Sequence, residues 1–126
     1  MTYAVIVNLT QYASDCLKKA NPIDKISSAA QSGRALKPSE AEDTGLPADF
    51  ASALERRMNY FLDLKNKGKL KFAGPFAELN AGMLIFEADS YEEAKVIVEK
   101  DPFYLNGFLL PNYDLRQWHV VFKSNM

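Results

Sequence analysis

Two short segments of the chain are apolar at both odd and even positions, and this feature restricts the fold more than any other. Residues 3–9 (YAVIVNL) and 82–88 (GMLIFEA) are rich in β-branched and aromatic residues, so each is predicted to form a strand. A strand that is apolar on both faces is normally covered on both faces. A sheet that contains these two strands therefore needs two layers of cover.

The clearest helix pattern covers residues 49–67, with Asp49 placed to cap its start and Gly68 placed to stop it. Apolar residues recur there every three or four positions, which indicates one buried stripe. The stripe consists of Phe50, Leu54, Met58, Phe61 and Leu62.

Strands are then predicted at 69–75 and 82–88, followed by a helix that starts after Ser90 and ends before Pro102. A last strand is predicted at 114–123. This order is the ferredoxin-like βαββαβ pattern, an α+β fold with one antiparallel sheet. The helices cover one face only, so we expect a second copy of the chain to cover the other, giving a homodimeric α+β barrel.

The first connection, residues 10–48, is unusually long. A short helix is predicted at 11–20 after Thr10, whereas 21–48 is dominated by Ser, Gly and Pro. A turn or two of helix at 38–43 is compatible with the pattern. A long irregular stretch is either functional or disordered, and we expect 21–48 to be a mobile, flap-like insertion over a pocket.

Composition excludes several classes of function. A chain of 126 residues is expected to form one domain, 1–126, and its net charge of −1 without a basic run argues against nucleic acid as a partner. Cys16 is alone and is expected to be inert, and with a single histidine no metal or other cofactor is predicted. No apolar run approaches the length of a membrane span and no signal peptide is visible, so a cytoplasmic protein is expected.

Four segments together resemble the YCII-related (YciI-like) family. They are GKLKFAGPF (68–76), GMLIFEADS with the following EEA (82–94), DPF (101–103) and YDLRQWHVVF (113–122). The resemblance covers about 3–9 and 54–123. It implies a dimeric α+β barrel of the muconolactone isomerase-like kind and a small enzyme acting on a modest organic ligand through a His–Asp pair. Some members of the family remove chloride from chlorinated hydroxyquinol-type substrates.

This chain departs from the family at the histidine, because Arg57 stands eleven residues before Gly68, where the family has that residue. An arginine cannot act as a general base near neutral pH. The leading hypothesis is a pocket for a small anionic ligand, with lyase- or isomerase-type chemistry on a cyclic or aromatic compound. The alternative is a catalytically silent YCII-like domain that binds a ligand or a protein partner.

The resemblance assigns the family's aspartate to Asp101, which is predicted to be catalytic. Because Asp101 is expected at a helix C-terminus, where a carboxylate is disfavoured, Arg57 or Arg116 could compensate its charge. Arg57 and Arg116 are candidate ligand-binding residues. The alternatives are that Arg57 only extends its head to solvent and that Asp101 only forms a turn.

His119 is the second candidate catalytic residue, since it alone titrates near neutral pH without perturbation. It is expected on one face of the last strand, and a structural or surface role is the alternative. Gly74 and Pro75 are candidate ligand-binding residues if their backbone approaches the ligand closely. They could equally form a tight turn.

Overall fold

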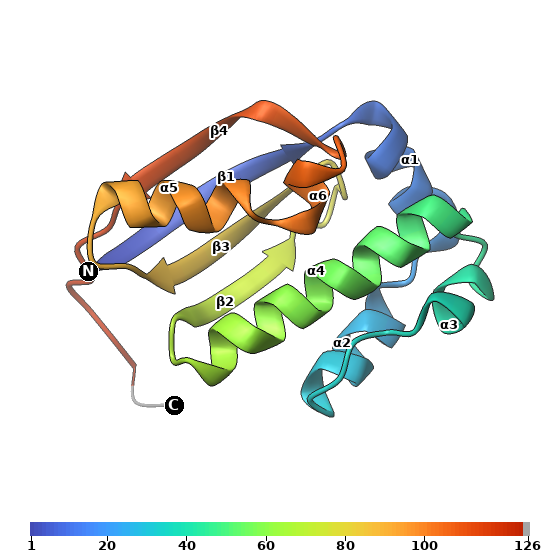
Figure 1. The fold of residues 1–126 in the computed structure, drawn as a ribbon, viewed down its shortest axis with the longest axis horizontal. Helices are drawn as coiled ribbons and strands as arrows, with labels where there is room; N and C mark the ends of the chain where they lie inside the picture. Colours follow the sequence, from blue (N-terminus) through green and yellow to red (C-terminus); the bar gives the residue numbers. More distant parts are fainter. Residues whose placement is uncertain (125–126) are drawn as a thin grey trace.

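The structure, a computed structural model, describes residues 1–124, and these residues form a four-stranded antiparallel sheet (Figure 1). The central strands are β1 (Thr2–Leu9) and β3 (Ala81–Glu87), and the edges are β2 (Leu70–Pro75) and β4 (Leu109–Gln117). Their order is β2-β3-β1-β4, with each neighbouring pair antiparallel. The predicted ferredoxin-like α+β fold is confirmed.

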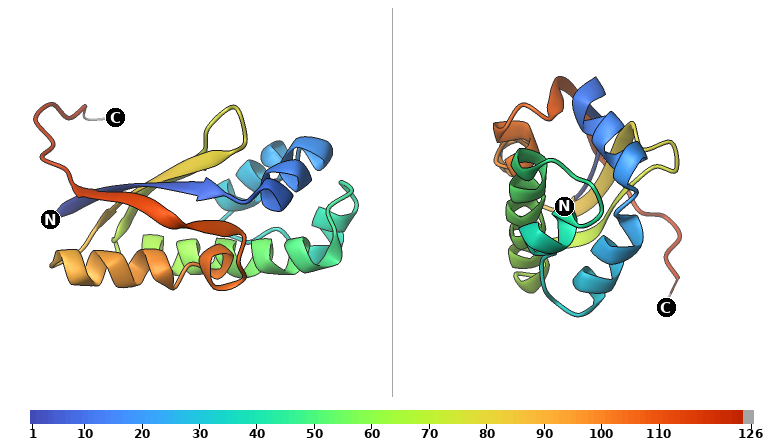
Figure 2. Two further views of the ribbon diagram at one scale, coloured as in Figure 1. Left: turned by 90° about the horizontal axis from the view of Figure 1, so that it is seen from above. Right: turned by 90° about the vertical axis from the view of Figure 1, so that its right-hand side faces the viewer.

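The described helices lie on one face of the sheet and around one of its ends. α4 (Ala48–Asn66), α5 (Tyr91–Glu99) and α6 (Pro102–Leu105) run along one face, whereas the other face carries no helix (Figure 2). The remaining helices belong to the insertion after β1: α1 (Gln11–Ala20), α2 (Ile23–Gln31) and α3 (Pro38–Glu42). The chain itself therefore supplies one layer of cover.

The alternation of side chains along β1 separates the two faces of the sheet. Tyr3, Val5 and Val7 are buried beneath the helices, because successive side chains of a strand point to opposite faces. Ile6 points to the open face and is 36% exposed, opposite Met83 of β3. The open face is thus apolar but uncovered within one chain, and its burial by a second copy stays a prediction.

The stripe of α4 faces the sheet as predicted, but the cap does not match the prediction. Phe50, Leu54 and Met58 are buried. Pro47 precedes the helix without a side-chain cap, and Asp49 lies in the first turn, where its carboxylate accepts a hydrogen bond from the Tyr12 hydroxyl at 2.9 Å. The carboxylate still lies at the end of the helix dipole that favours negative charge.

The insertion is more ordered in secondary structure than predicted. Helix α3 matches the expected turn at 38–43, but α2 lies where we predicted a loop. The signal was present, because Ile23, Ile26 and Ala30 recur at helical spacing, and the surrounding Ser and Pro obscured it. Buried residues of the segment, Leu36, Ala41 and Leu46, join the main core, so the insertion is not a disordered loop.

The last strand begins and ends earlier than predicted: β4 covers Leu109–Gln117, not 114–123. The Trp118 amide donates to the Thr2 carbonyl at 2.8 Å, and β1 starts at that residue. Beyond this point the apolar alternation continues without a neighbouring strand. The segment after β4 lies off the end of the sheet, and Phe122 is 94% exposed (Figure 2).

Three phenylalanine rings pack together where α6 contacts α4 beneath the sheet. The ring centroids of Phe50 and Phe103 are 5.0 Å apart, and Phe108 lies 5.2 Å and 5.7 Å from these two rings. All three side chains are buried. Aromatic packing of this kind holds the short α6 in place, and with it the residue that precedes it, Asp101.

Candidate functional site

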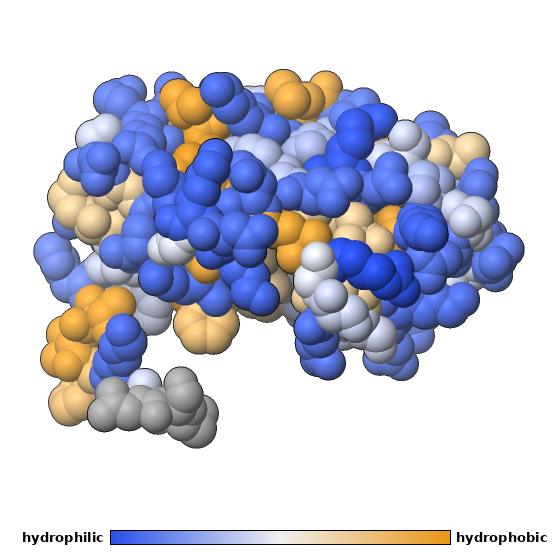
Figure 3. Space-filling view, turned by 60° about the horizontal axis from the view of Figure 1, so that its bottom comes forward, coloured by the Kyte–Doolittle hydropathy of each residue, from blue (hydrophilic) through white to orange (hydrophobic). Residues whose placement is uncertain are grey.

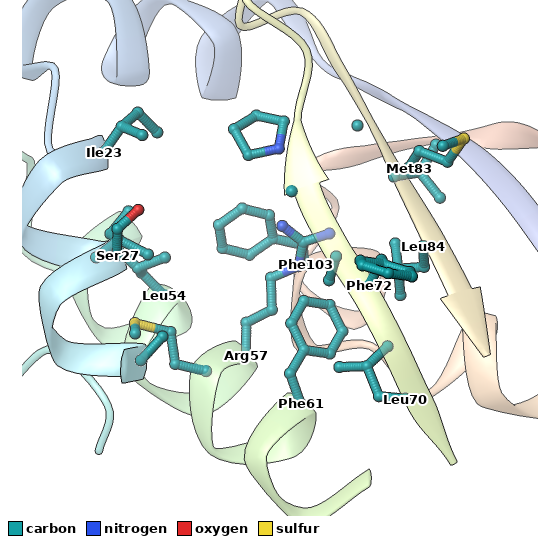
Figure 4. A pocket seen from close by; sticks show the side chains of 18 of the residues that line it. Ile23, Ser27, Leu54, Arg57, Phe61, Leu70, Phe72, Met83, Leu84 and Phe103 are labelled. Atoms are coloured by element: carbon teal, nitrogen blue, oxygen red, sulfur yellow. The ribbon is translucent and has the colours of Figure 1, made fainter. Parts of the chain in front are cut away.

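A cavity of about 440 Å³ lies between the β2–β3 edge of the sheet and helices α4 and α2. This volume falls in the usual range of pockets for small organic molecules, roughly 300–1,000 Å³. On the side of the molecule shown in Figure 3, apolar residues gather near the centre among hydrophilic surroundings. Figure 4 shows side chains from both helices and both strands converging on the hollow.

Arg57 is the most buried polar side chain that lines this cavity, and it forms an ion pair with Asp101. Its Nε lies 3.1 Å from both carboxylate oxygens of Asp101. The Arg57 side chain is 18% exposed and that of Asp101 only 3%. The sequence left two candidate partners for Asp101, and the structure brings Arg57 to it.

The sequence predicted Asp101 at a helix C-terminus, and the structure gives it a second position as well. It is also the N-cap of α6, where its carboxylate accepts a hydrogen bond from the Phe103 amide at 2.9 Å. Pro102 starts α6, since a proline is well suited to the first helical position. Asp101 still follows the end of α5 directly, but its carboxylate now has the Phe103 amide and the Arg57 guanidinium as hydrogen-bond donors.

The guanidinium of Arg57 lies between two aromatic rings. Its central carbon is 4.8 Å from the ring centroid of Phe61 and 4.4 Å from that of Phe103 (Figure 4). Both contacts are within the range of cation–π attraction. Together with Asp101 they fix the position of the charged group, so little conformational freedom remains to be lost when a ligand binds it.

The two Nη atoms of Arg57 remain free to bind a ligand. Within residues 1–124, only its Nε donates a hydrogen bond to a protein group, and no buried side-chain polar atom lacks a partner. The Nη atoms are therefore accessible from the hollow that Arg57 lines. An arginine arranged in this way offers two parallel N–H donors to a planar anion.

Gly74 and Pro75, two candidate ligand-binding residues from the sequence, both line the cavity. They belong to β2, however, and do not form a tight turn. A Cβ added at Gly74 would meet no atom within 4 Å, so the backbone there does not require glycine. The close approach occurs at Gly82, whose added Cβ would lie 3.0 Å from the Gly74 carbonyl oxygen.

Arg116 and His119 do not reach this cavity. Arg116 is exposed on β4 and pairs with Asp114, with 2.8 Å between Nε and the carboxylate. His119 lies beyond the end of β4, on an exposed segment, instead of on a face of the last strand. The structure thus brings together four of the six predicted site residues: Arg57, Asp101, Gly74 and Pro75.

Sequence reasoning missed the apolar walls and two cations. Phe61 was predicted only as part of the buried stripe of the helix at 49–67, Phe103 was not singled out, and α2 was not predicted. Lys65 and Lys71 also line the cavity. Their spacing from Arg57 along α4 and on β2 carried no recognisable motif, so only the fold could reveal them.

Two titratable groups near the core are held in their neutral forms. Burial, and secondarily the charge of Asp101, raise the pKa of Tyr60 to about 12, and its hydroxyl donates to the Ile97 carbonyl at 2.7 Å. Burial also raises the pKa of the Cys16 thiol, which keeps it protonated and unreactive. Neither group is suited to be a nucleophile or base at neutral pH.

Across residues 1–124 no group of three or more His, Cys, Asp or Glu side chains is placed to hold a metal ion. In the same range, no helix combines the length and apolarity needed to cross a membrane.

Comparison with known proteins gives a family match and a structural match. The family model described as the YCII-related domain matches residues 36–119. The uncharacterised protein YjpA of Bacillus subtilis (strain 168) is 44% identical over 48 residues, which cover 37% of this chain. The matched region spans about half, 56%, of the length of that relative.

A solved structure shares the fold. It is the 5-chloro-2-hydroxyhydroquinone dehydrochlorinase TftG from Burkholderia phenoliruptrix AC1100, in complex with 2,5-dihydroxybenzoquinone. The TM-score is 0.52 at 17% identity, and the alignment covers 94% of each chain. At this identity the likeness is one of fold.

Proposed function

Because the chain belongs to the YCII-related family, we propose that it binds a small organic anion in the cavity beside Arg57. The observation that carries the proposal is the fixed guanidinium of Arg57. It is held by Asp101 and two aromatic rings, with both Nη atoms left open to a hollow of ligand size. Lys65 and Lys71 line the same hollow, and their positive charge favours an anion.

Lyase- or isomerase-type chemistry on a cyclic or aromatic anion is the second candidate. It is supported by the family and by the fold shared with a dehydrochlorinase. Such chemistry normally needs a base, and Asp101 is the acidic residue nearest to Arg57. Its carboxylate already accepts hydrogen bonds from Arg57 and from the Phe103 amide, and it is almost fully buried. Ligand binding without proton transfer is therefore the better-supported function.

The test is a calorimetric titration with benzoate, cyclohexanecarboxylate and 2,5-dihydroxybenzoquinone, with benzamide as the neutral analogue. The key variant is the double substitution Arg57→Gln/Asp101→Asn, which removes the guanidinium but keeps a hydrogen-bonded pair of similar shape. We expect it to weaken binding of the anions by roughly 1.5–3 kcal/mol, the usual contribution of a hydrogen bond to a charged group. The matched control is Arg56→Gln on the exposed face of α4, where the same charge is lost.

Binding of benzamide as tightly as benzoate, or equal affinity of the double variant and the native protein for benzoate, would contradict the proposal. Turnover of a cyclic anion that carries a leaving group, lost on Asp101→Asn, would instead favour the enzyme.

We also propose that the protein is a homodimer joined through the open face of the sheet. That face presents Ala4, Ile6, Met83 and Ile85 of the central strands, and Phe72 of β2 is 70% exposed. A second copy carries the same apolar patch, so a two-fold axis can bury both at once. Light scattering should give about twice the chain mass of 14.1 kDa, and Ile6→Asp should give the monomer. A native protein that is monomeric at micromolar concentration would contradict this arrangement.

A further inference from the structure

The cavity has one wall made by the insertion. Ile23, Ile26 and Ala30 lie on the face of α2 that lines the hollow, and Ser27 lies among them (Figure 4). All three apolar side chains are only half-buried: Ile26 and Ala30 pack partly against the core, and all three also border the hollow. Apolar surface that stays uncovered inside a concave site is characteristic of a ligand pocket.

The opposite wall is also apolar. Helix α4 contributes Leu54, Met58, Phe61 and Leu62. No acidic side chain lines the cavity within the part of the chain that the structure describes. The polar side chains are Arg57, Lys65, Lys71 and Ser27, and both lysines are exposed, whereas Arg57 is held deep in the site. A matching ligand therefore has one charged end and an apolar body.

The charge and shape at Arg57 indicate which anion fits. Asp101 already neutralises the guanidinium, so Arg57 acts mainly through the geometry of its N–H donors. The net positive charge of the hollow comes from Lys65 and Lys71, which are exposed. Two parallel N–H donors match the two oxygens of a carboxylate, which is planar and carries a single charge. A phosphate monoester carries more charge and a tetrahedral arrangement of oxygens.

We propose that the ligand of this cavity is an apolar monocarboxylate, and that α2 of the insertion is the wall that contacts its hydrocarbon body. The inference rests on the proposed function, since it takes the anion site at Arg57 as given. It makes α2 a specificity-determining element: Arg57 selects the charged end, and Ile23 and Ile26 select the length and apolarity of the rest.

The first experiment is a titration with butyrate, hexanoate and octanoate, together with octyl phosphate and 1-octanol. Each added methylene that becomes buried should raise the affinity about fourfold. Octanoate should bind more tightly than either octyl phosphate or octanol. If benzoate binds in an Arg57-dependent manner but affinity does not rise from butyrate to octanoate, the proposed function stands and this inference is wrong. If no anion binds, both are wrong.

The second experiment tests the wall itself. Ile23→Ser/Ile26→Ser should lower the ratio of octanoate to butyrate affinity on the order of tenfold, because the lost apolar contact affects only the longer ligand. The control is Val96→Ser, which changes an exposed β-branched residue on α5, away from the cavity. Ser27→Leu is a second α2 variant, which, unlike Ile23→Ser/Ile26→Ser, keeps the apolar packing of the helix. It narrows the hollow and should weaken octanoate more than butyrate. An unchanged ratio in both α2 variants would overturn the assignment of α2.

Discussion

The Nε of Arg57 lies 3.1 Å from both carboxylate oxygens of Asp101, a residue 44 positions further along the chain. This pair joins α4 to the start of α6, and the same carboxylate caps α6 through the Phe103 amide. One buried carboxylate thus has a structural role and at the same time fixes the cation that faces the cavity. Variants at this pair must separate the two roles.

We predict that Arg57→Ala destabilises the protein by about 3–5 kcal/mol, because it leaves Asp101 buried without its cation. From the sequence alone we would expect a small effect on stability, and the burial of the pair changes that expectation. Urea unfolding followed by circular dichroism measures the change. The free energy of unfolding should fall much less for Arg57→Gln/Asp101→Asn. For Arg56→Ala, at an exposed neighbouring residue, it should stay within about 0.5 kcal/mol of the native value. Equal stability of Arg57→Ala and the native protein would contradict the prediction.

The aromatic cluster should contribute more to stability than its position near the end of the sheet suggests. Phe50→Ala removes a fully buried ring that contacts both Phe103 and Phe108, so we expect a loss of about 3–5 kcal/mol. The same unfolding experiment applies. Leu105→Ala removes a large apolar side chain that is 68% exposed and should have little effect, which makes it the matched control.

Stability at acidic pH should depend on Glu93. A hydrogen bond from Lys69, with 2.6 Å between Nζ and the carboxylate, and one from the Asp89 amide hold the pKa of Glu93 below its usual value of 4.5. Because the folded-state pKa is the lower one, the stabilisation is complete above pH 4.5 and is lost as the pH falls through the folded value.

The melting temperature measured between neutral and acidic pH tests this. Below pH 4.5, the melting temperature of the native protein should fall more steeply than that of Glu93→Gln. Glu92→Gln, on the exposed side of the same turn, should follow the native curve. Parallel curves for native protein and Glu93→Gln would show that the Lys69–Glu93 pair does not affect folding.

Within the insertion, α2 should exchange its amide hydrogens faster than α4 and faster than the segment around α3. Helix α2 has one buried residue, Ala29, and borders a hollow, whereas Leu36, Ala41 and Leu46 anchor the following segment in the core. Hydrogen exchange read by mass spectrometry can resolve the three regions. The expected flap is then narrower than 21–48. Protection of α2 equal to that of β1 would make it a rigid wall.

Local periodicity was enough to predict most of the elements. The stripe of α4, the two strands that form the centre of the sheet and the Ser90 cap of α5 each depend on residues close together in the chain, so the pattern is visible in the sequence. The order of these elements then specified the sheet topology. The expectation that Arg57 replaces a histidine of the family came from the resemblance and a count from Gly68, and it stays a prediction.

The tertiary structure decided the features that depend on partners distant in sequence. The segment after Gln117 keeps a strand-like alternation but forms no strand, because β1 begins at Thr2 and offers no further backbone to pair with. Asp101 became a partner of Arg57 only when α4 was placed beside it, whereas its role as the cap of α6 is local to residues 101–103 and was missed in the sequence. Likewise, Ile23 and Ile26 line a cavity only because α2 lies across from α4 and the sheet edge, an arrangement determined by packing and not by any local pattern.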